Sequence, residues 1–248
     1  MRKTKIVCTM GPSTDKEEVL KQMMLEGMNV ARCNFSHGSY EEHKKRMDMI
    51  KKLRKEVGKP VAILLDTKGP EVRIKTFKEG KVTLTAGQLF TLTAEEVEGT
   101  KDKVSVTYDR LYEDLEVGMR VLIDDGLIEM CVEKVEKKDI VCRVINGGVV
   151  SNRKGVNVPD VDLSMPYISD KDREDILFGI SQDVDFIAAS FVQKKEDIIQ
   201  LRKLLEKNGG EEIRIIAKIE NTQGVSNIDD IIEVSDGIMV ARGDMGVE

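Results

Sequence analysis

The sequence contains no tryptophan, only 4% aromatic residues and two histidines among its 248 residues. Long hydrophobic runs are absent too. The longest, such as Val61–Leu65, fall far short of the ~18–20 residues that a membrane-spanning helix needs. The first five residues lead into only a short apolar stretch before Gly11, which does not fit a secretory signal. We therefore expect a cytoplasmic protein without a membrane partner.

Closely spaced cysteines and an excess of basic residues are also missing. Four cysteines (Cys8, Cys33, Cys131 and Cys142) show no C-x-x-C spacing, so we expect reduced thiols and no zinc site. Lys and Arg number 39 against 45 Asp and Glu, a net charge of −6, which argues against nucleic acid as a partner. Any anionic ligand must then be held by a local cluster of cations.

The remaining composition is that of a folded globular protein with room for one large domain or two smaller ones. The first third alternates strands and helices. Lys5–Met10 is typical of a buried strand, and the run Thr14 to Glu17 has the form of a capping box that opens a helix ending at Gly27.

The same rhythm continues through residues 29–66. A strand is expected at 29–35, a second capping box at Ser39 to Glu42, a helix closing near Gly58, and a strand at 61–66. Strands separated by helices imply a parallel sheet with right-handed crossovers.

After Gly69 the helical period disappears for almost a hundred residues, and alternating segments such as Lys81–Thr85 and Val121–Ile123 replace it. A helix start at Ser169 then restores the first pattern. We expect strands at 185–192, 214–220 and 237–242, with helices at 195–208 and 228–234. The predicted domains are 1–69 and 167–248 for the α/β part and 70–166 for an inserted β lid, with hinges at Gly69-Pro70 and 159–166.

About six parallel strands suit either an open doubly wound sheet or a (β/α)₈ barrel. No G-x-G-x-x-G follows the first strand, which weakens the dinucleotide-binding alternative. If the fold is a barrel, two β/α units are expected beyond Glu248.

Polar residues gather where the predicted strands end, the edge at which both fold types bind ligands. They include the cations Arg32, Lys218 and Arg242, the acids Asp66, Glu220 and Asp244, and the neutral residues Asn34, Ser36 and Thr67. Alone, each would more often be a structural ion or hydrogen-bonding group than a catalyst. Together, oxygen ligands favour Mg²⁺ or K⁺, and Arg with Lys favours phosphate, so the set indicates phosphoryl chemistry.

Two histidines accompany this edge. His37 fits a ligand contact and a simple loop residue equally well, whereas His43, in a Lys-rich helix, is expected to be solvated.

Seven motifs raise the specificity of this interpretation. They are Lys5–Ser13, Ala31–Gly38, Leu65–Arg73, Asp124–Gly126, Lys154–Asn157, Ala217–Asn221 and Met239–Glu248. In this order, and covering nearly the whole chain, they closely resemble the pyruvate kinase family. The resemblance implies a (β/α)₈ barrel, represented by about six units, with an inserted β-barrel lid. It also implies transfer of phosphate from phosphoenolpyruvate to ADP, which gives pyruvate and ATP in the last step of glycolysis.

The resemblance also implies two metal sites. Glu220 and Asp244 would hold Mg²⁺ or Mn²⁺, and Asn34, Ser36, Asp66 and Thr67 would hold K⁺. Glu71 matches the acid of potassium-dependent members, so we expect potassium dependence.

The implied roles in catalysis and substrate binding fall on the same edge and on the lid. Lys218, Arg32 and Arg73 would be catalytic, and Arg32, Lys218, Gly243 and Asp244 would bind phosphoenolpyruvate. The positions facing the nucleotide would be Arg32, Asn34, His37, Arg73, Lys154 and Asp125. A lysine beside carboxylates keeps its charge, so Lys218 can stabilise the transferring phosphoryl oxygens without acting as a nucleophile.

Full-length family members continue with two more barrel units and a C-terminal domain, and they form homotetramers. We therefore expect little or no turnover from these 248 residues alone. Two other functions stay open: a metal- and phosphate-binding module without turnover, and a lyase or aldolase that acts on pyruvate enolate.

Overall fold

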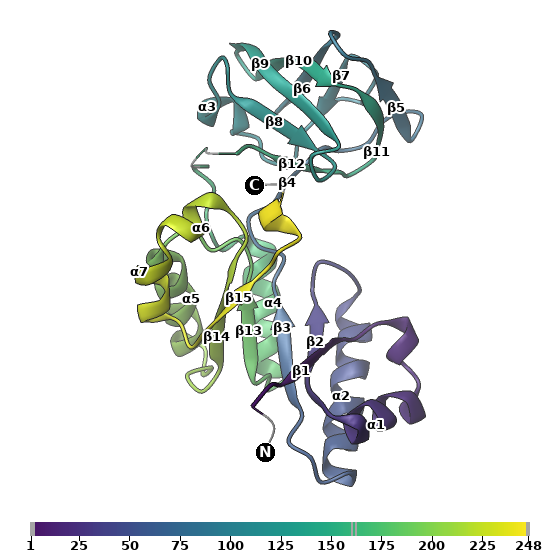
Figure 1. Cartoon of the computed structure of the whole chain (residues 1–248), viewed down its shortest axis with the longest axis vertical. Helices are drawn as coiled ribbons and strands as arrows, with labels where there is room; N and C mark the ends of the chain where they lie inside the picture. Colours follow the sequence, from purple (N-terminus) through teal and green to yellow (C-terminus); the bar gives the residue numbers. More distant parts are fainter. Residues whose placement is uncertain (1–2, 160, 162, 247–248) are drawn as a thin grey trace. The chain divides into compact units, whose positions relative to one another are not determined.

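The computed structural model describes residues 3–159, 161 and 163–246 and divides the chain into two compact units (Figure 1). The first unit comprises Met1–Gly69, Tyr167–Ile219 and Asn227–Val240. The second comprises Pro70–Pro166, Glu220–Ser226 and Ala241–Glu248. Val247 and Glu248, which end the last sequence motif, and positions 160 and 162 of the expected hinge lie outside the described residues.

The first unit is built on a curled six-stranded sheet in the order β1-β2-β3-β13-β14-β15. Its strands are β1 (Ile6–Thr9), β2 (Met28–Asn34), β3 (Ala62–Asp66), β13 (Phe186–Ala189), β14 (Arg214–Ile219) and β15 (Gly237–Val240). All five pairings are parallel, as the alternation of strands and helices predicted. The carboxyl ends of all six strands therefore lie at one edge.

Helices connect these strands and bury their apolar faces against the sheet (Figure 1). They are η1 (Pro12–Thr14), α1 (Glu17–Glu26), α2 (Tyr40–Glu56), α4 (Asp170–Ser181), α5 (Lys195–Lys207) and α7 (Ile228–Val234). In α2, Met47, Ile50 and Leu53 recur at helical spacing and are completely buried. Each such side chain contributes about 1.5–3 kcal/mol through burial, which fixes the helices against the sheet.

One of the two predicted capping boxes is present. The Ser39 backbone N–H donates to Glu42 Oε2 at 2.7 Å and the Glu42 N–H donates to Ser39 Oγ at 3.3 Å, which starts α2. The prediction at Thr14 is wrong. Thr14 closes η1 and its Oγ1 accepts from the Gly11 N–H at 3.0 Å, while Lys16 precedes α1 without a side-chain cap. Pro12 favours a tight turn here, so the threonine serves that turn instead.

Two strands end earlier than expected. The fourth strand, predicted over 185–192, stops at Ala189 because Phe191 has a φ of 53°, which no strand accommodates. The sixth stops at Val240 rather than at Arg242. Both residues after the shortened β13, Ser190 and Phe191, thus become part of the loop at the carboxyl edge.

The second unit is almost entirely β-structure. A seven-stranded sheet has the order β4-β12-β8-β9-β10-β6-β7, and β11 pairs with β5. The strands are β4 (Val72–Arg73), β5 (Lys81–Leu84), β6 (Leu89–Thr93), β7 (Lys103–Ser105), β8 (Arg120–Ile123), β9 (Ile128–Glu136), β10 (Asp139–Asn146), β11 (Gly148–Ser151) and β12 (Gly155–Asn157). Phe90, Leu92 and Met130 are among its fully buried core residues.

Short helical segments complete the second unit. They are α3 (Leu111–Asp114), which the sequence pattern did not predict, α6 (Thr222–Ser226) and η2 (Asp244–Gly246). The expected turn at Asp125-Gly126 connects β8 to β9, and Asp124, Asp125 and Gly126 all have positive φ. Across the described part of the chain, no helix combines the length and apolar character that crossing a bilayer requires.

Candidate active site

Three charged side chains from three different strands meet at the carboxyl edge of the first unit. Asp66 Oδ2 accepts from Arg32 Nε at 2.5 Å, and Asp66 Oδ1 lies 3.1 Å from Lys218 Nζ. A second guanidinium nitrogen of Arg32, Nη2, also contacts Oδ2. The predicted residues Arg32, Asp66 and Lys218 therefore form one cluster, with a single carboxylate shared by two cations.

Strand pairing explains why these residues meet. β3 lies between β2 and β13, with Asn34 opposite Asp66 in one pairing and Ala188 opposite Asp66 in the other. β14, which carries Lys218, is the next strand after β13. Alternation of side chains along β2 places Arg32 on the polar face between buried Ala31 and Cys33.

The cluster is largely buried. The Asp66 side chain is 1% exposed, that of Lys218 is 11% exposed and that of Arg32 is 25% exposed. A carboxylate removed from water needs cations or hydrogen-bond donors around it, because an unpaired buried charge costs several kcal/mol. Arg32 is also tied to β1, since its Nη1 donates to Thr9 Oγ1 at 2.8 Å.

Ser190 belongs to the same cluster, although the sequence pattern did not single it out. Lys218 Nζ donates to Ser190 Oγ at 2.7 Å, and that hydroxyl donates to the Thr67 carbonyl at 2.7 Å. The usable signal was a polar residue after the apolar run Phe186–Ala189. The predicted strand over 185–192 hid it by placing Ser190 inside regular structure.

The oxygen-bearing residues expected around a monovalent cation lie on neighbouring strand ends. Asn34 Oδ1 accepts from the Ser36 N–H at 3.0 Å, and the Phe35 N–H donates to the Asp66 carbonyl at 2.9 Å. Thr67, which is 6% exposed, follows directly. The structure thus brings Asn34, Ser36 and Asp66 to one end of the β2–β3 pair, and their oxygen donors are of the kind that K⁺ prefers.

The two histidines have different environments. His37 is exposed in the loop after β2, whereas His43, expected to be solvated, is only 3% exposed. The His43 ring stacks on Phe35 at 4.0 Å between centroids, and its Nε2 lies 2.8 Å from the His37 carbonyl. Burial lowers the pKa of His43 below its usual value, with the His37 carbonyl acting in the opposite direction. His43 thus lies on the buried face of α2, whereas the lysines lie on its solvated side.

Glu220 and Asp244, expected to hold a divalent cation, belong to the second unit together with Gly243. Glu220 directly follows β14 and is 1% exposed, whereas Arg242, Gly243 and Asp244 are exposed around the start of η2. Among residues 3–159, 161 and 163–246, no group of three or more His, Cys, Asp or Glu side chains is placed to hold a metal ion. Glu220 and Asp244 supply carboxylate oxygens of the kind that Mg²⁺ prefers.

The inserted β-region carries its own pairs of charged residues. Arg73 forms a two-pronged contact with Glu71, at 2.8 Å from Nε to Oε2 and 2.6 Å from Nη2 to Oε1. Lys154 Nζ lies 2.8 Å from Asp124 Oδ1, and the neighbouring Asp125 is exposed. The second unit therefore brings Arg73 close to Glu71 and keeps Lys154 beside the β8–β9 turn.

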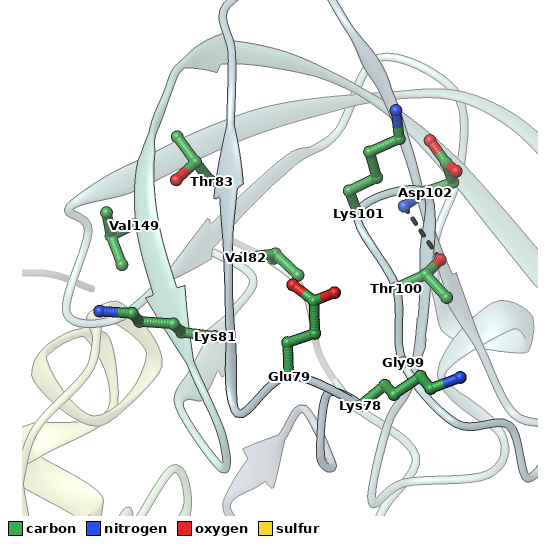
Figure 2. A pocket seen from close by; sticks show the side chains of 10 residues that line it. All are labelled: Lys78, Glu79, Lys81, Val82, Thr83, Gly99, Thr100, Lys101, Asp102 and Val149. Carbon is green, nitrogen blue, oxygen red and sulfur yellow. Dashed lines mark hydrogen bonds between the residues drawn. The ribbon is translucent and has the colours of Figure 1, made fainter.

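A separate pocket of about 730 Å³ lies on the second unit (Figure 2). It is lined by Lys78, Glu79, Lys81, Val82, Thr83, Gly99, Thr100, Lys101, Asp102 and Val149. Three lysines and two carboxylates line it, and the backbone N–H of Asp102 donates to Thr100 Oγ1 at 3.2 Å. None of the residues expected to bind substrate, nucleotide or metal lines this pocket.

Comparison with known proteins places these observations in a family. The family model described as pyruvate kinase, barrel domain, matches residues 1–248. Pyruvate kinase from Staphylococcus saprophyticus is 56% identical to this chain, that from Bacillus licheniformis 54% and that from Staphylococcus aureus strain MRSA252 53%. Each alignment covers 100% of this chain and 43% of the relative.

The match extends to the fold. Six parallel strands with helical crossovers are β/α units of the family's barrel domain, so the chain has the predicted incomplete (β/α)₈ architecture. The same family description removes the open doubly wound sheet as an alternative. Sequence and fold agree that this chain is a member of the pyruvate kinase family.

Proposed function

We propose that this chain supplies the phosphoryl-transfer site of an enzyme that converts phosphoenolpyruvate and ADP into pyruvate and ATP. The carrying observation is the buried Asp66 carboxylate that holds Arg32 and Lys218 together. Two cationic side chains lie beside this one carboxylate, so an anionic phosphoryl group can contact two positive charges at one edge of the sheet. Membership in the pyruvate kinase family supports this choice of reaction.

The two cations have different tasks in this proposal. Arg32 offers a planar fork of N–H donors, which suits the oxygens of a bound phosphate. Lys218 is a compact charge on a buried strand, and it stabilises the phosphoryl oxygens as negative charge shifts during transfer. Burial of the cluster favours this stabilisation, since electrostatic interactions strengthen where water is excluded.

A monovalent cation fits the oxygen donors of Asn34, Ser36, Asp66 and Thr67. These four residues would hold K⁺, which adds fixed positive charge beside the transferring group. Glu71, the acid that marks potassium dependence in the resemblance, is engaged with Arg73. In this proposal, the ends of the adjacent strands β2 and β3 hold the oxygen atoms of these four residues in position around the cation.

A divalent cation fits the two carboxylates Glu220 and Asp244, with substrate oxygens completing its shell. Bound Mg²⁺ would neutralise phosphate charge. The backbone N–H groups of Gly243 and Asp244 are proposed to receive the substrate carboxylate.

The inserted segment 70–166 is proposed to act as a lid that contacts the nucleotide, between barrel segments 1–69 and 167–248. Arg73, Lys154 and Asp125 would serve it there, together with Arg32, Asn34 and His37. Arg73 and Lys154 have side chains 35% and 36% exposed, so a phosphate can replace their present carboxylate partners at small cost.

The test uses the complete polypeptide that carries these residues, supplied with phosphoenolpyruvate, Mg²⁺ and K⁺. We expect pyruvate to appear only when ADP is added, and to slow strongly when Na⁺ replaces K⁺. Lys218→Met should reduce turnover by about 10²–10³-fold or more while leaving the fold intact. Near-normal turnover of that variant would contradict the role of Lys218.

Two further outcomes identify the alternatives. Carbon–carbon cleavage without nucleotide would indicate a lyase or aldolase. Binding of phosphate and metal without any turnover by the complete polypeptide would indicate a binding module.

A further inference from the structure

Ser190 occupies a position at the carboxyl edge that the proposed chemistry does not yet use. It follows the last residue of β13 and is 1% exposed. β13 lies between β3, which ends at Asp66 and leads directly into Thr67, and β14, which carries Lys218. The side chain therefore lies between a residue proposed to stabilise transferring charge and two residues proposed to hold a cation.

The Ser190 hydroxyl both donates and accepts a hydrogen bond in this position. Its one proton goes to the Thr67 carbonyl at 2.7 Å, and its oxygen accepts from Lys218 Nζ at 2.7 Å. The same oxygen lies 3.3 Å from Asp66 Oδ1, the atom that also faces Lys218 Nζ at 3.1 Å. Two oxygens therefore face the ammonium of Lys218, one from Asp66 at the end of β3 and one from Ser190 just after β13.

The backbone of Ser190 is held equally firmly. Its N–H donates to Thr67 Oγ1 at 3.1 Å, and its carbonyl accepts from the Tyr167 hydroxyl at 3.1 Å. Phe191 adopts a φ of 53°, a conformation that a bulky side chain rarely takes and that persists only where the surroundings impose it. Backbone strain of this kind clusters at functional sites, which directs attention to the serine beside it.

Gly69 shows how little freedom this loop has. A Cβ atom at Gly69 would lie 2.9 Å from Ser190 Cβ and 3.0 Å from the Ser190 carbonyl oxygen. The chain segment after β3 and the segment after β13 therefore pack backbone against backbone. Ser190 is thus held beside Lys218 by its hydrogen bonds to Thr67 and by its close packing against Gly69.

We propose that Ser190 is a positioning residue that aims the Lys218 ammonium at the transferring phosphoryl group and couples its position to the Thr67 carbonyl. This inference rests on the proposed function. It assigns to Ser190 no contact with substrate. Its effect appears in the rate of phosphoryl transfer rather than in the binding of phosphoenolpyruvate or ADP, because Lys218 stabilises charge that develops during the transfer.

The experiment compares serine variants in the complete polypeptide. Ser190→Ala removes the hydroxyl, Ser190→Cys keeps the size but replaces Oγ with a weak hydrogen-bonding sulfur, and Ser190→Thr keeps the hydroxyl. We expect kcat to fall about 10- to 100-fold in the alanine and cysteine variants, with KM for both substrates within about twofold. The threonine variant should recover most of the loss.

Ser105→Ala is the matched control. Ser105 lies in the second unit, is also 1% exposed, donates to a backbone carbonyl at 2.7 Å and accepts at 2.8 Å. It therefore measures the cost of deleting a buried serine hydroxyl away from Lys218. We expect this variant to lose thermal stability by a similar amount while kcat stays unchanged.

Thermal melting of each variant separates misfolding from mispositioning. If the added methyl of threonine prevents folding, the alanine and cysteine variants still decide the matter through kcat at temperatures where both are folded. The inference would be overturned if Ser190→Ala and Ser190→Cys both kept a kcat within twofold of the parent. It would also be overturned if KM rose while kcat stayed unchanged. If Lys218→Met also retains normal turnover, the proposed role of Lys218 is wrong, and the inference about Ser190 falls with it. If Lys218→Met is inactive but the Ser190 variants are fully active, only the role of Ser190 is wrong.

Discussion

The charged pairs of the first unit and those of the second differ in burial and in sharing. In the first unit, Arg32 and Lys218 share Asp66, and the carboxylate is 1% exposed. In the second unit, Arg73 has Glu71 and Lys154 has Asp124, with acid side chains 20% and 16% exposed. One arrangement fixes cations in place, whereas the other keeps them available to a new partner.

Under the proposed function, the difference separates a group that stabilises the transferring phosphoryl group from groups that bind a nucleotide. A group that must stabilise transient charge gains from a rigid and water-poor site, because its dipoles and charges need no rearrangement during the reaction. A group that binds and releases a nucleotide gains from solvent-exposed pairs, which exchange at little cost. Matched substitutions in the two units test this contrast.

Removal of the carboxylate should have the largest effect on stability. Asp66→Asn leaves two cations around a neutral amide, which should lower the free energy of unfolding by about 3–5 kcal/mol. Glu71→Gln, the same change in the second unit, should cost less than about 1 kcal/mol because the Arg73 side chain remains partly hydrated. Urea titrations followed by circular dichroism measure both. Equal losses would show that burial does not distinguish the two pairs.

Two glycines with positive φ provide the next contrast. A Cβ atom added at Gly69, where φ is 74°, would lie within 3.0 Å of Ser190 atoms, whereas one added at Gly118, where φ is 93°, would have no heavy atom within 4 Å. Gly69→Ala should cost about 2–5 kcal/mol from backbone strain and steric overlap combined. Gly118→Ala should cost about 1–2 kcal/mol from strain alone. The same urea titrations apply, and a smaller loss for Gly69→Ala than for Gly118→Ala would refute the close packing.

An exposed cation should affect binding more than stability. Lys154→Met should leave the free energy of unfolding within about 0.5 kcal/mol, since its pair with Asp124 is partly solvated. In the complete polypeptide we expect KM for ADP to rise about three- to tenfold, equivalent to about 0.7–1.4 kcal/mol. Lys134→Met, which breaks the exposed pair with Glu136, is the control that should leave KM unchanged. A change in kcat alone would contradict a nucleotide-binding role.

The smallest effect concerns acidity, and it should be confined to the first unit, which contains both histidines. Burial lowers the folded-state pKa of His43 below 6.5. Its stabilising contribution is therefore complete above about pH 6.5 and declines as the pH falls from there toward the folded-state value, because only the unfolded chain takes up the proton. We expect Tm to fall slightly between about pH 7 and pH 5.

Calorimetry of two glutamine variants checks this assignment. His43→Gln should flatten the pH dependence of Tm in that range, whereas His37→Gln, at an exposed position, should retain it. Retention of the full slope in His43→Gln would show that other groups cause it.

The alternation of strands and helices was predictable because the inner strands, such as β3 and β13, are mostly buried and leave a continuous apolar signal. The expected burial of the first strand is wrong, since β1 lies at the edge of the sheet and its residues Ile6 and Val7 are exposed. Residue spacing also indicated that Arg32, Asp66 and Lys218 reach one edge, since that follows from strand direction alone. The capping box at Ser39 was predictable because it involves only Ser39 and Glu42, three residues apart. At Thr14 the same motif failed because Pro12 and Gly11 offered the hydroxyl a different partner.

The parts that could not be predicted depend on contacts between distant segments. The early end of β13 follows from the conformation of Phe191, and the burial of His43 follows from its stacking on Phe35. Ser190 was missed because nothing local distinguishes a strand residue from the first residue beyond the strand. Its significance appears only when Thr67 and Lys218 are placed on either side of it.

Because β3 pairs with β13, the charge cluster can form only late in the synthesis of the chain. Arg32 precedes Asp66 by 34 residues, whereas Ser190 follows it by 124. At about 5–20 residues per second, a ribosome needs roughly 6–25 s to add those 124 residues. Throughout that interval Arg32 is the one partner in the cluster that has already been synthesised, and the edge of β3 that pairs with β13 has no partner strand. The charge cluster around Asp66 is therefore completed late in the synthesis of the protein.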